Sequence, residues 1–125
     1  MKIEGIDHVQ IAAPCDSEDM LRQFYVGLLG FEEIEKPVAL KGRGGVWFNC
    51  GNMQLHVGID AEPPMNEPSR RHIAFRIRSL EECRRALRSA GLTIEEDKAP
   101  IPGAIRLYLR DPVGNRVELL QPLKP

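Results

Sequence analysis

The sequence predicts an α+β fold built from two copies of a βαβββ module. Three observations lead to this prediction. Segments in which apolar and polar residues alternate, as in half-buried strands, recur along the 125 residues. Two segments with helical spacing of apolar residues, at 16–30 and 80–91, each follow an alternating segment. Three further strand patterns then follow each helix in the same order, which indicates an internal duplication.

The first half is expected to run strand, helix and then three strands. Its helix has a polar residue that can serve as N-cap, Asp16 or Ser17, and a glycine, Gly30, that can end it. The expected elements are a strand at 6–14, a helix at 16–30, a short strand within 31–40 that breaks at Pro37, and a hairpin of strands at 45–51 and 53–60.

The second half repeats this order. Ser79 is expected to cap its helix, with Glu82 three residues later as in a capping box, and Gly91 to end it. The expected elements are a strand at 71–79, a helix at 80–91, and strands at 92–100, 104–112 and 115–122. The prolines and polar residues of 61–70 predict a connector. We therefore expect one domain of two modules, 1–60 and 71–125, joined by the linker 61–70.

Composition and charge exclude several classes of function. The net charge is −1, which gives no electrostatic basis for binding nucleic acid or an anionic membrane. No apolar run reaches the length of a membrane span, and the N-terminus lacks a signal-peptide pattern. The three cysteines are widely spaced and include no CxxC pair. These features predict a cytoplasmic protein in a reducing compartment.

The duplication aligns four polar residues at matched places. His8 aligns with His72 at an offset of 64 residues, and His56 aligns with Glu118 at an offset of 62. Each of the four has apolar neighbours on both sides or alternates with them, so each is expected to point away from the sheet face that meets the helices. If the first and last strands of each half curl together, all four converge in one cup.

Imidazoles and a carboxylate are suitable ligands for a borderline divalent ion such as Zn, Ni, Co, Mn or Fe(II). We therefore predict a metal site formed by His8, His56, His72 and Glu118, which leaves two neighbouring positions for water or a chelating substrate. Each residue alone is better explained as a satisfied or solvated strand residue. The agreement of repeat and side-chain direction favours the metal site.

Two further residues are candidates for binding the substrate. Arg76 has the same side-chain direction as His72 and could pair with a carboxylate or phosphate, although a solvated strand residue is the alternative. Trp47 and Phe48 place one aromatic ring on each face of their strand. We expect Phe48 in the core and Trp47 in the wall of the pocket.

The duplicated module and the segment "DPVGNRVEL" at 111–119 resemble the vicinal oxygen chelate superfamily, which includes glyoxalase I, bleomycin-resistance proteins, fosfomycin-resistance thiol transferases, methylmalonyl-CoA epimerase and extradiol dioxygenases. The segments "DHVQIA", "LRQFYVGLLGFEE" and "RHIAFRI" are similar to its first-strand, first-helix and fifth-strand patterns. The resemblance implies that the modules form a glyoxalase-like incomplete barrel of mixed sheet with flanking helices. It also implies pairing of two chains in a homodimer, with sites within one chain or shared between two.

The resemblance also implies which residues bind the metal. Metal-using members have ligands where this chain has His8, His56, His72 and Glu118. Extradiol dioxygenases and fosfomycin-resistance enzymes use three ligands, at the places of His8, His72 and Glu118. Glyoxalase I adds a fourth, usually Glu or Gln, where this chain has His56. Bleomycin-resistance relatives lack such ligands, so the full set argues against that branch.

The implied activity is that of a metal-dependent lyase or isomerase of a small oxygenated substrate, with Glu118 as ligand and as the base that takes a proton from carbon. Bacterial glyoxalases that look most like this chain carry Arg and Asn where Ala12 and Asp60 stand here, and both help to hold glutathione. An aspartate would repel the carboxylates of glutathione, so we expect a different substrate. The alternatives are an Fe(II) or Mn(II) dioxygenase and a metal-free protein that binds a drug or metabolite.

Overall fold

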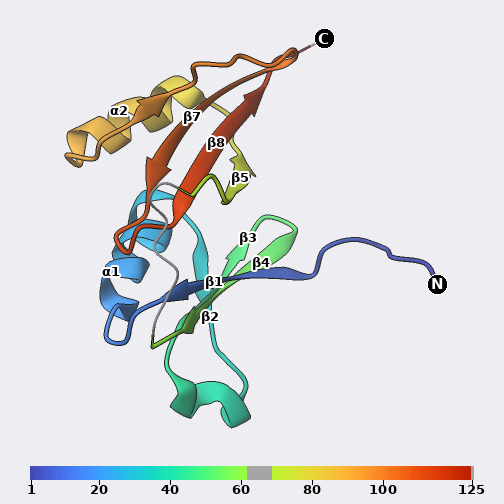
Figure 1. The fold of residues 1–125 in the computed structure, drawn as a ribbon, viewed down its shortest axis with the longest axis vertical. Coiled ribbons are helices and arrows are strands. Elements are labelled where there is room, and N and C mark those ends of the chain that lie inside the picture. The colour runs from blue at the N-terminus through green and yellow to red at the C-terminus, as the bar shows by residue number, and fades with distance from the viewer. Residues whose placement is uncertain (62–68, 125) are drawn as a thin grey trace. The chain divides into compact units, whose positions relative to one another are not determined.

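A computed structural model describes residues 1–61 and 69–124 of the chain (Figure 1). The chain divides into two units, Met1–Pro64 and Met65–Pro125, and each contains one open, four-stranded mixed sheet. Helices flank one face of each sheet, so the predicted α+β fold with two βαβββ modules is confirmed. Most of the connector expected at 61–70 lies outside the described residues.

In the first unit the sheet order is β1-β4-β3-β2, so the first and last strands are parallel neighbours and the first strand lies at the edge. The other two strand pairs are antiparallel. The elements are β1 (His8–Ala13), α1 (Glu18–Arg22), the π-helix η1 (Gln23–Leu28), β2 (Glu32–Ile34), the 3-10 helix η2 (Val38–Arg43), β3 (Val46–Cys50) and β4 (Met53–Ile59).

The second unit repeats this sheet order as β5-β8-β7-β6, again with the first and last strands parallel. The elements are β5 (His72–Arg76), α2 (Leu80–Ser89), β6 (Glu95–Glu96), β7 (Ala104–Arg110) and β8 (Arg116–Pro122). Ser79 caps α2 as predicted, since its side chain accepts a hydrogen bond from the backbone N–H of Glu82.

The helix expected at 16–30 differs from the prediction. Only Glu18–Arg22 form an α-helix, and a π-helix follows, in which the N–H of Leu29 donates to the carbonyl of Phe24. A π-turn changes which side chains face the sheet, and Tyr25 is buried beside Phe24 as a result. Ser17 stands at the N-cap position as predicted but makes no capping hydrogen bond, because its hydroxyl donates to the carbonyl of Pro14 at 2.6 Å.

Two expected strands are shorter than predicted. The segment 31–40 is a strand only at Glu32–Ile34, and after Pro37 the chain turns into the 3-10 helix η2. The segment 92–100 pairs only at Glu95–Glu96. Both are edge strands of their sheets, where few backbone hydrogen bonds hold the chain extended.

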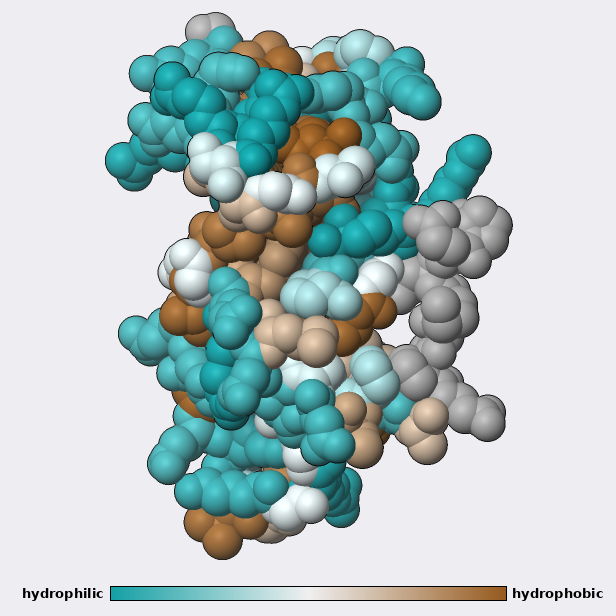
Figure 2. All heavy atoms as spheres, turned by 90° about the vertical axis from the view of Figure 1, so that its left-hand side faces the viewer, coloured by the Kyte–Doolittle hydropathy of each residue, from teal (hydrophilic) through white to brown (hydrophobic). Residues whose placement is uncertain are grey.

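Each unit has its own core between its helices and one face of its sheet. In the first unit, the ring of Tyr25 lies 5.4 Å from that of Phe48. In the second, Leu80 and Leu87 of α2 are buried, whereas its exposed face carries charged residues. Hydrophilic side chains accordingly cover the upper part of Figure 2, where α2 lies. None of the described helices is long and apolar enough to cross a membrane.

Candidate functional site

In the first unit, two of the predicted ligands lie against each other. His8 of β1 and His56 of β4 have ring centroids 4.2 Å apart, with 17° between the ring planes. The parallel pairing of these strands places both side chains on one face, since Gln10 rather than Val9 pairs with His56. The side chain of His8 is 45% exposed, whereas His56 is only 5% exposed. The structure therefore brings this pair together.

Trp47 contacts the same pair from the other side. Its ring lies 3.6 Å from that of His56, with 3° between the planes, and the β3–β4 register places the two residues opposite each other. Because β4 lies between β1 and β3, His56 is the middle ring of a stack of three. Trp47 also lines a cavity of about 630 Å³ together with charged residues of α1 and β2. None of the four predicted ligands lines this cavity, so the place of Trp47 in the wall of the substrate pocket stays a prediction.

The hydrogen bonds of the two imidazoles indicate which nitrogen each has available. Nδ1 of His8 lies 2.9 Å from the carboxylate of Asp7, which can only accept, so Nδ1 carries the proton and Nε2 is left with a lone pair in the neutral ring. Nε2 of His56 lies 2.8 Å from Oε1 of Gln54, an acceptor, so Nε2 carries the proton and Nδ1 has the lone pair in the neutral ring. Burial, and then the neighbouring His8, lower the pKa of His56 and favour the neutral form that binds metals.

The stack itself limits how this pair can bind one ion. The lone pair of a ring nitrogen lies in the plane of its ring, so two nearly parallel rings cannot both direct lone pairs to one point. One ring must turn. His8 is the ring with room to do so, because it is half exposed, whereas His56 is buried and held by Trp47 and Gln54.

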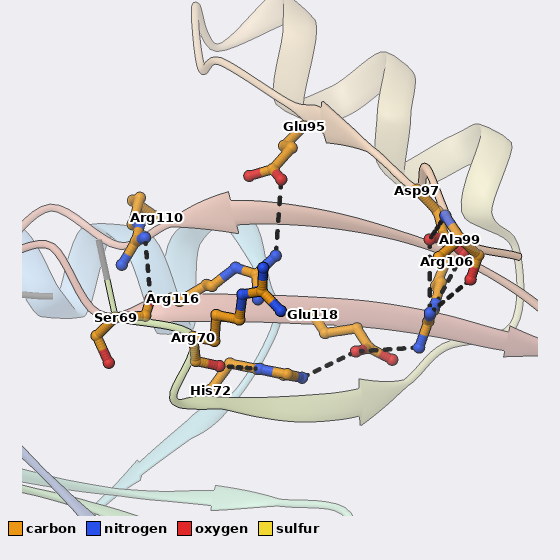
Figure 3. A network of polar contacts seen from close by, with 10 residues as sticks. All are labelled: Ser69, Arg70, His72, Glu95, Asp97, Ala99, Arg106, Arg110, Arg116 and Glu118. Atoms are coloured by element: carbon orange, nitrogen blue, oxygen red, sulfur yellow. Dashed lines mark hydrogen bonds and ion pairs between the residues drawn. The ribbon is translucent and has the colours of Figure 1, made fainter. Parts of the chain in front are cut away.

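In the second unit, the other two predicted ligands are in direct contact (Figure 3). Nε2 of His72 lies 3.0 Å from Oε1 of Glu118, although the two residues are far apart in the sequence. The parallel pairing of β5 with β8 causes this, since it aligns His72 with Arg116 and Ala74 with Glu118. Glu118 is only 3% exposed.

The hydrogen bonds of His72 indicate a site for a cation. Its Nδ1 lies 2.7 Å from the carbonyl oxygen of Arg70, which can only accept, so Nδ1 carries a proton. In a neutral ring, Nε2 would then present a lone pair to a carboxylate oxygen of Glu118. A proton or a metal ion must lie between them. The 3.0 Å separation also fits a metal, because two adjacent ligands about 2.1 Å from an ion are about 3.0 Å apart.

A turn shaped by Asp111 leads into β8. Its Oδ1 accepts hydrogen bonds from the backbone N–H groups of Val113 and Asn115, at 3.0 and 2.8 Å, and its Oδ2 accepts one from the Asn115 side chain. Gly114 completes the turn with a φ of 97°, a conformation that favours glycine. The most specific part of the sequence pattern, 111–115, thus fixes the start of the strand that carries Glu118.

Three residues near Glu118 were not among the sequence candidates. Tyr108 lies opposite Glu118 in the β7–β8 register, and Nη1 of Arg106 lies 3.8 Å from Oε1 of Glu118. The guanidinium of Arg116 lies over the Tyr108 ring, 4.0 Å from its centroid. Burial, followed by the neighbouring Glu118, raises the pKa of Tyr108. The alternation 106–108 on β7, the strand beside β8, is the sequence signal that could have indicated these side chains.

The remaining candidate, Arg76, is exposed at the end of β5, on the same face as His72. Each unit thus holds two of the four predicted metal ligands in contact. Within either unit, the side chains that the structure describes form no group of three His, Cys, Asp or Glu residues able to hold a metal ion.

Residues 5–119 match the family model of the glyoxalase/bleomycin resistance protein/dioxygenase superfamily. The chain belongs to this superfamily. The predicted resemblance is therefore confirmed over nearly the whole chain. A search of the curated proteins gave no match.

Solved structures from the glyoxalase superfamily are similar to the chain along its full length. A Bacillus anthracis protein assigned to the glyoxalase family shares 42% identity over 98% of each chain, with a TM-score of 0.89. The lactoylglutathione lyase of Agrobacterium tumefaciens shares 22%, covering 97% of this chain and 96% of its own, with a TM-score of 0.72. A fosfomycin resistance protein of Listeria monocytogenes shares 17%, covering 96% and 94%, with a TM-score of 0.77. The last two likenesses support the fold alone.

Proposed function

We propose that this superfamily member is a metal-dependent lyase or isomerase of a small oxygenated substrate, with His8, His56, His72 and Glu118 as ligands of one divalent ion. The observation that carries the proposal is the contact between His72 and Glu118. There, a ring nitrogen lies opposite a buried carboxylate, and either a proton or a metal ion can lie between them. Membership of a superfamily whose model includes glyoxalases supports this class of activity.

A bound divalent ion would supply Lewis-acid chemistry, polarising substrate oxygens and stabilising negative charge. Glu118 is proposed as the base that takes a proton from a substrate carbon, since it is a buried carboxylate and a proposed ligand of the same ion. Arg76 would pair with a carboxylate or phosphate of the substrate, and Trp47 would pack against its apolar part.

A dioxygenase is the second candidate function, and the state of His56 favours it. His56 is the buried middle ring of the stack and is bonded to Gln54, so it is the ligand least able to turn toward an ion, and the three others are His8, His72 and Glu118. Two histidines and one carboxylate are the ligand set of non-haem Fe(II) oxygenases. The metal identity therefore separates the two functions.

Metal analysis of protein purified without chelators tests the proposal. Stoichiometric Ni, Zn or Co, together with turnover of methylglyoxal with or without thiols, supports the lyase or isomerase. Iron with oxygen uptake on catechols supports the dioxygenase. Protein without metal whose ligand binding survives His72→Ala would overturn both and leave a binding protein.

We also propose that the protein is a cytoplasmic homodimer, on the basis of its superfamily. Light scattering of the purified protein tests the dimer. If the dimer completes the site, mixing chains that carry His8→Ala with chains that carry Glu118→Gln should restore part of the metal binding.

A further inference from the structure

We propose that Arg116 is a specificity-determining residue that binds an anionic group of the substrate, a phosphate or a carboxylate. The substrate class is then a small oxygenated acid. The proposal rests on the proposed function, because it places this anionic group beside two of the metal ligands named there. It concerns the face of the second sheet that carries His72 and Glu118.

Arg116 lies next to both of these proposed ligands. It precedes Glu118 by two residues on β8, so the two side chains share one sheet face, and it is directly opposite His72 in the β5–β8 register (Figure 3). Neighbouring strands are about 5 Å apart, and alternate residues of one strand are about 7 Å apart. Arg76, by contrast, lies at the other end of β5 from His72. A group bound to Arg116 would therefore lie beside the proposed metal position.

An aromatic ring holds the guanidinium of Arg116 in place. Its central carbon lies 4.0 Å from the centroid of the Tyr108 ring, and the side chain of Arg116 is only 15% exposed. Tyr108 is itself buried, with its ring edge-to-face against that of His72. A guanidinium that is already stacked loses little conformational freedom when it binds an anion.

The N–H groups of Arg116 are available to a ligand. Its Nη2 lies 3.6 Å from Oε1 of Glu95, which is beyond hydrogen-bond distance, and Glu95 is 58% exposed, so this ion pair is weak (Figure 3). Within residues 1–61 and 69–124, the guanidinium of Arg116 makes no hydrogen bond. Its donors form a planar fork that fits the oxygens of a carboxylate or a phosphate.

Two other arginines of this sheet face differ from Arg116 in this respect. Arg106 donates a hydrogen bond to the carboxylate of Asp97 at 2.8 Å, and Arg110 donates one to the carbonyl of Gly114 at 3.1 Å. Both lie on β7, and protein groups take up their donors. Arg116 thus combines a fixed position beside the proposed ligands with donors that the described part of the chain does not use.

The charges of this face also favour an anion. Glu118 would balance one of the two charges of a divalent ion, and imidazole ligands would balance none. The pairs Arg106–Asp97 and Arg116–Glu95 are each neutral, so the site would keep an excess of positive charge. An anionic group at Arg116 would offset this excess, whereas a cationic group would be repelled.

The test measures anion binding to the metal-free protein by NMR titration, with inorganic phosphate and acetate as separate probes. The dissociation constant of the tighter probe should rise at least about tenfold in Arg116→Gln, because charge-assisted hydrogen bonds are lost. Arg88→Gln is the matched control and should bind as the wild-type chain does. Arg88 is an exposed arginine of the same unit that also pairs with one carboxylate, that of Glu96. Tighter binding of phosphate would assign a phosphoryl group, and tighter binding of acetate a carboxylate.

Glu95→Gln separates anion binding from a merely structural role of Arg116. Because the carboxylate of Glu95 competes with the anion, its removal should lower the dissociation constant about threefold. Arg116→Lys keeps the charge without the planar fork and should bind with intermediate affinity. A structural role alone would lower the melting temperature and leave the dissociation constants unchanged. If Arg116→Gln does not fold, the result for Glu95→Gln decides.

The metal-free protein also separates this inference from the proposed function. If the wild-type chain takes up no metal, the proposed function fails, and anion binding that depends on Arg116 still supports the anion site. If the chain takes up metal but binds neither probe, or binds them equally well in Arg116→Gln, the role of Arg116 is refuted and the metal site stands.

Discussion

The two units share one sheet topology but surround the matched residue of their last strand in different ways. His56 of the first unit lies between the rings of Trp47 and His8. Glu118 of the second unit lies 3.0 Å from Nε2 of His72 and 3.8 Å from Nη1 of Arg106. The matched residues are equally buried, at 5% and 3% exposure, so depth in the sheet does not explain the difference.

The charge of the matched residue explains its surroundings. A neutral imidazole can be buried between flat rings, and burial lowers the pKa of His56 in the direction that keeps it neutral. A buried carboxylate needs a polar partner, which His72 provides at 3.0 Å, and Arg106 of the neighbouring strand β7 adds a positive charge at 3.8 Å. The duplicated backbone thus fixes where the two residues lie, and the neighbouring strand determines which charge each place can carry.

The largest effect should come from removing the negative charge of the Glu118 side chain in the second unit. Glu118→Gln keeps the shape of the side chain but removes the proposed anionic ligand, so metal affinity should fall by more than about 100-fold, beyond the effect of an outer-shell residue. Metal content after gel filtration measures it. Glu95→Gln is the control, since Glu95 lies on the same sheet face, 58% exposed, with Arg116 as its ion-pair partner. Wild-type metal content in Glu118→Gln would remove Glu118 from the ligand set.

A second variant places a carboxylate, the group found at Glu118 in the second unit, at the matched position 56 of the first unit. His56→Glu puts a carboxylate between aromatic rings that offer it no strong donor, so the free energy of unfolding should fall by about 2 kcal/mol. Urea denaturation measures this loss, and His56→Gln, which is uncharged, should lose less. Equal stability of the two variants would show that the stack does not select against charge.

Much of this contrast follows from the sequence, for a physical reason. Strand alternation fixes side-chain direction, so the shared face of His8 and His56 and that of His72 and Glu118 could be predicted from single residues. The duplication gave the order of strands in both units, because each module repeats the same connections.

Other features depend on contacts that one segment does not encode. The π-turn after Arg22 is a shift of backbone hydrogen bonds that leaves the apolar spacing almost unchanged. The contact between the rings of Tyr108 and His72 depends on the β7–β8 register and on side-chain rotation, and within its own strand Tyr108 resembles any half-buried aromatic residue. The stack on His56 likewise forms only when three strands are aligned.

The pH dependence of stability should differ between the wild-type chain and a variant without His56. Folding lowers the pKa of His56 below its ordinary value of 6.5, so below that pH the unfolded chain binds a proton that the folded chain does not. The contribution of His56 to stability is therefore complete above about pH 6.5 and declines as the pH falls through the folded pKa. Unfolding in urea across this range should show the decline in the wild-type chain and a flatter profile in His56→Gln. Parallel profiles of stability against pH in the two proteins would show that His56 does not cause the decline.

The smallest expected effect concerns the polar contact that holds the stack. Gln54→Met keeps the length of the side chain but removes the hydrogen bond to Nε2 of His56, so the free energy of unfolding should fall by about 1 kcal/mol. Asn49→Ala is the control, because Asn49 pairs with Gln54 across the strands and its side chain bonds only the exposed Glu32 at 3.3 Å. If both variants lose the same stability, the amide of Gln54 contributes no more than a surface contact, and the ring of Trp47 alone holds His56. A larger loss in Gln54→Met would show that the first unit, although mostly aromatic, also needs one polar partner at its matched residue.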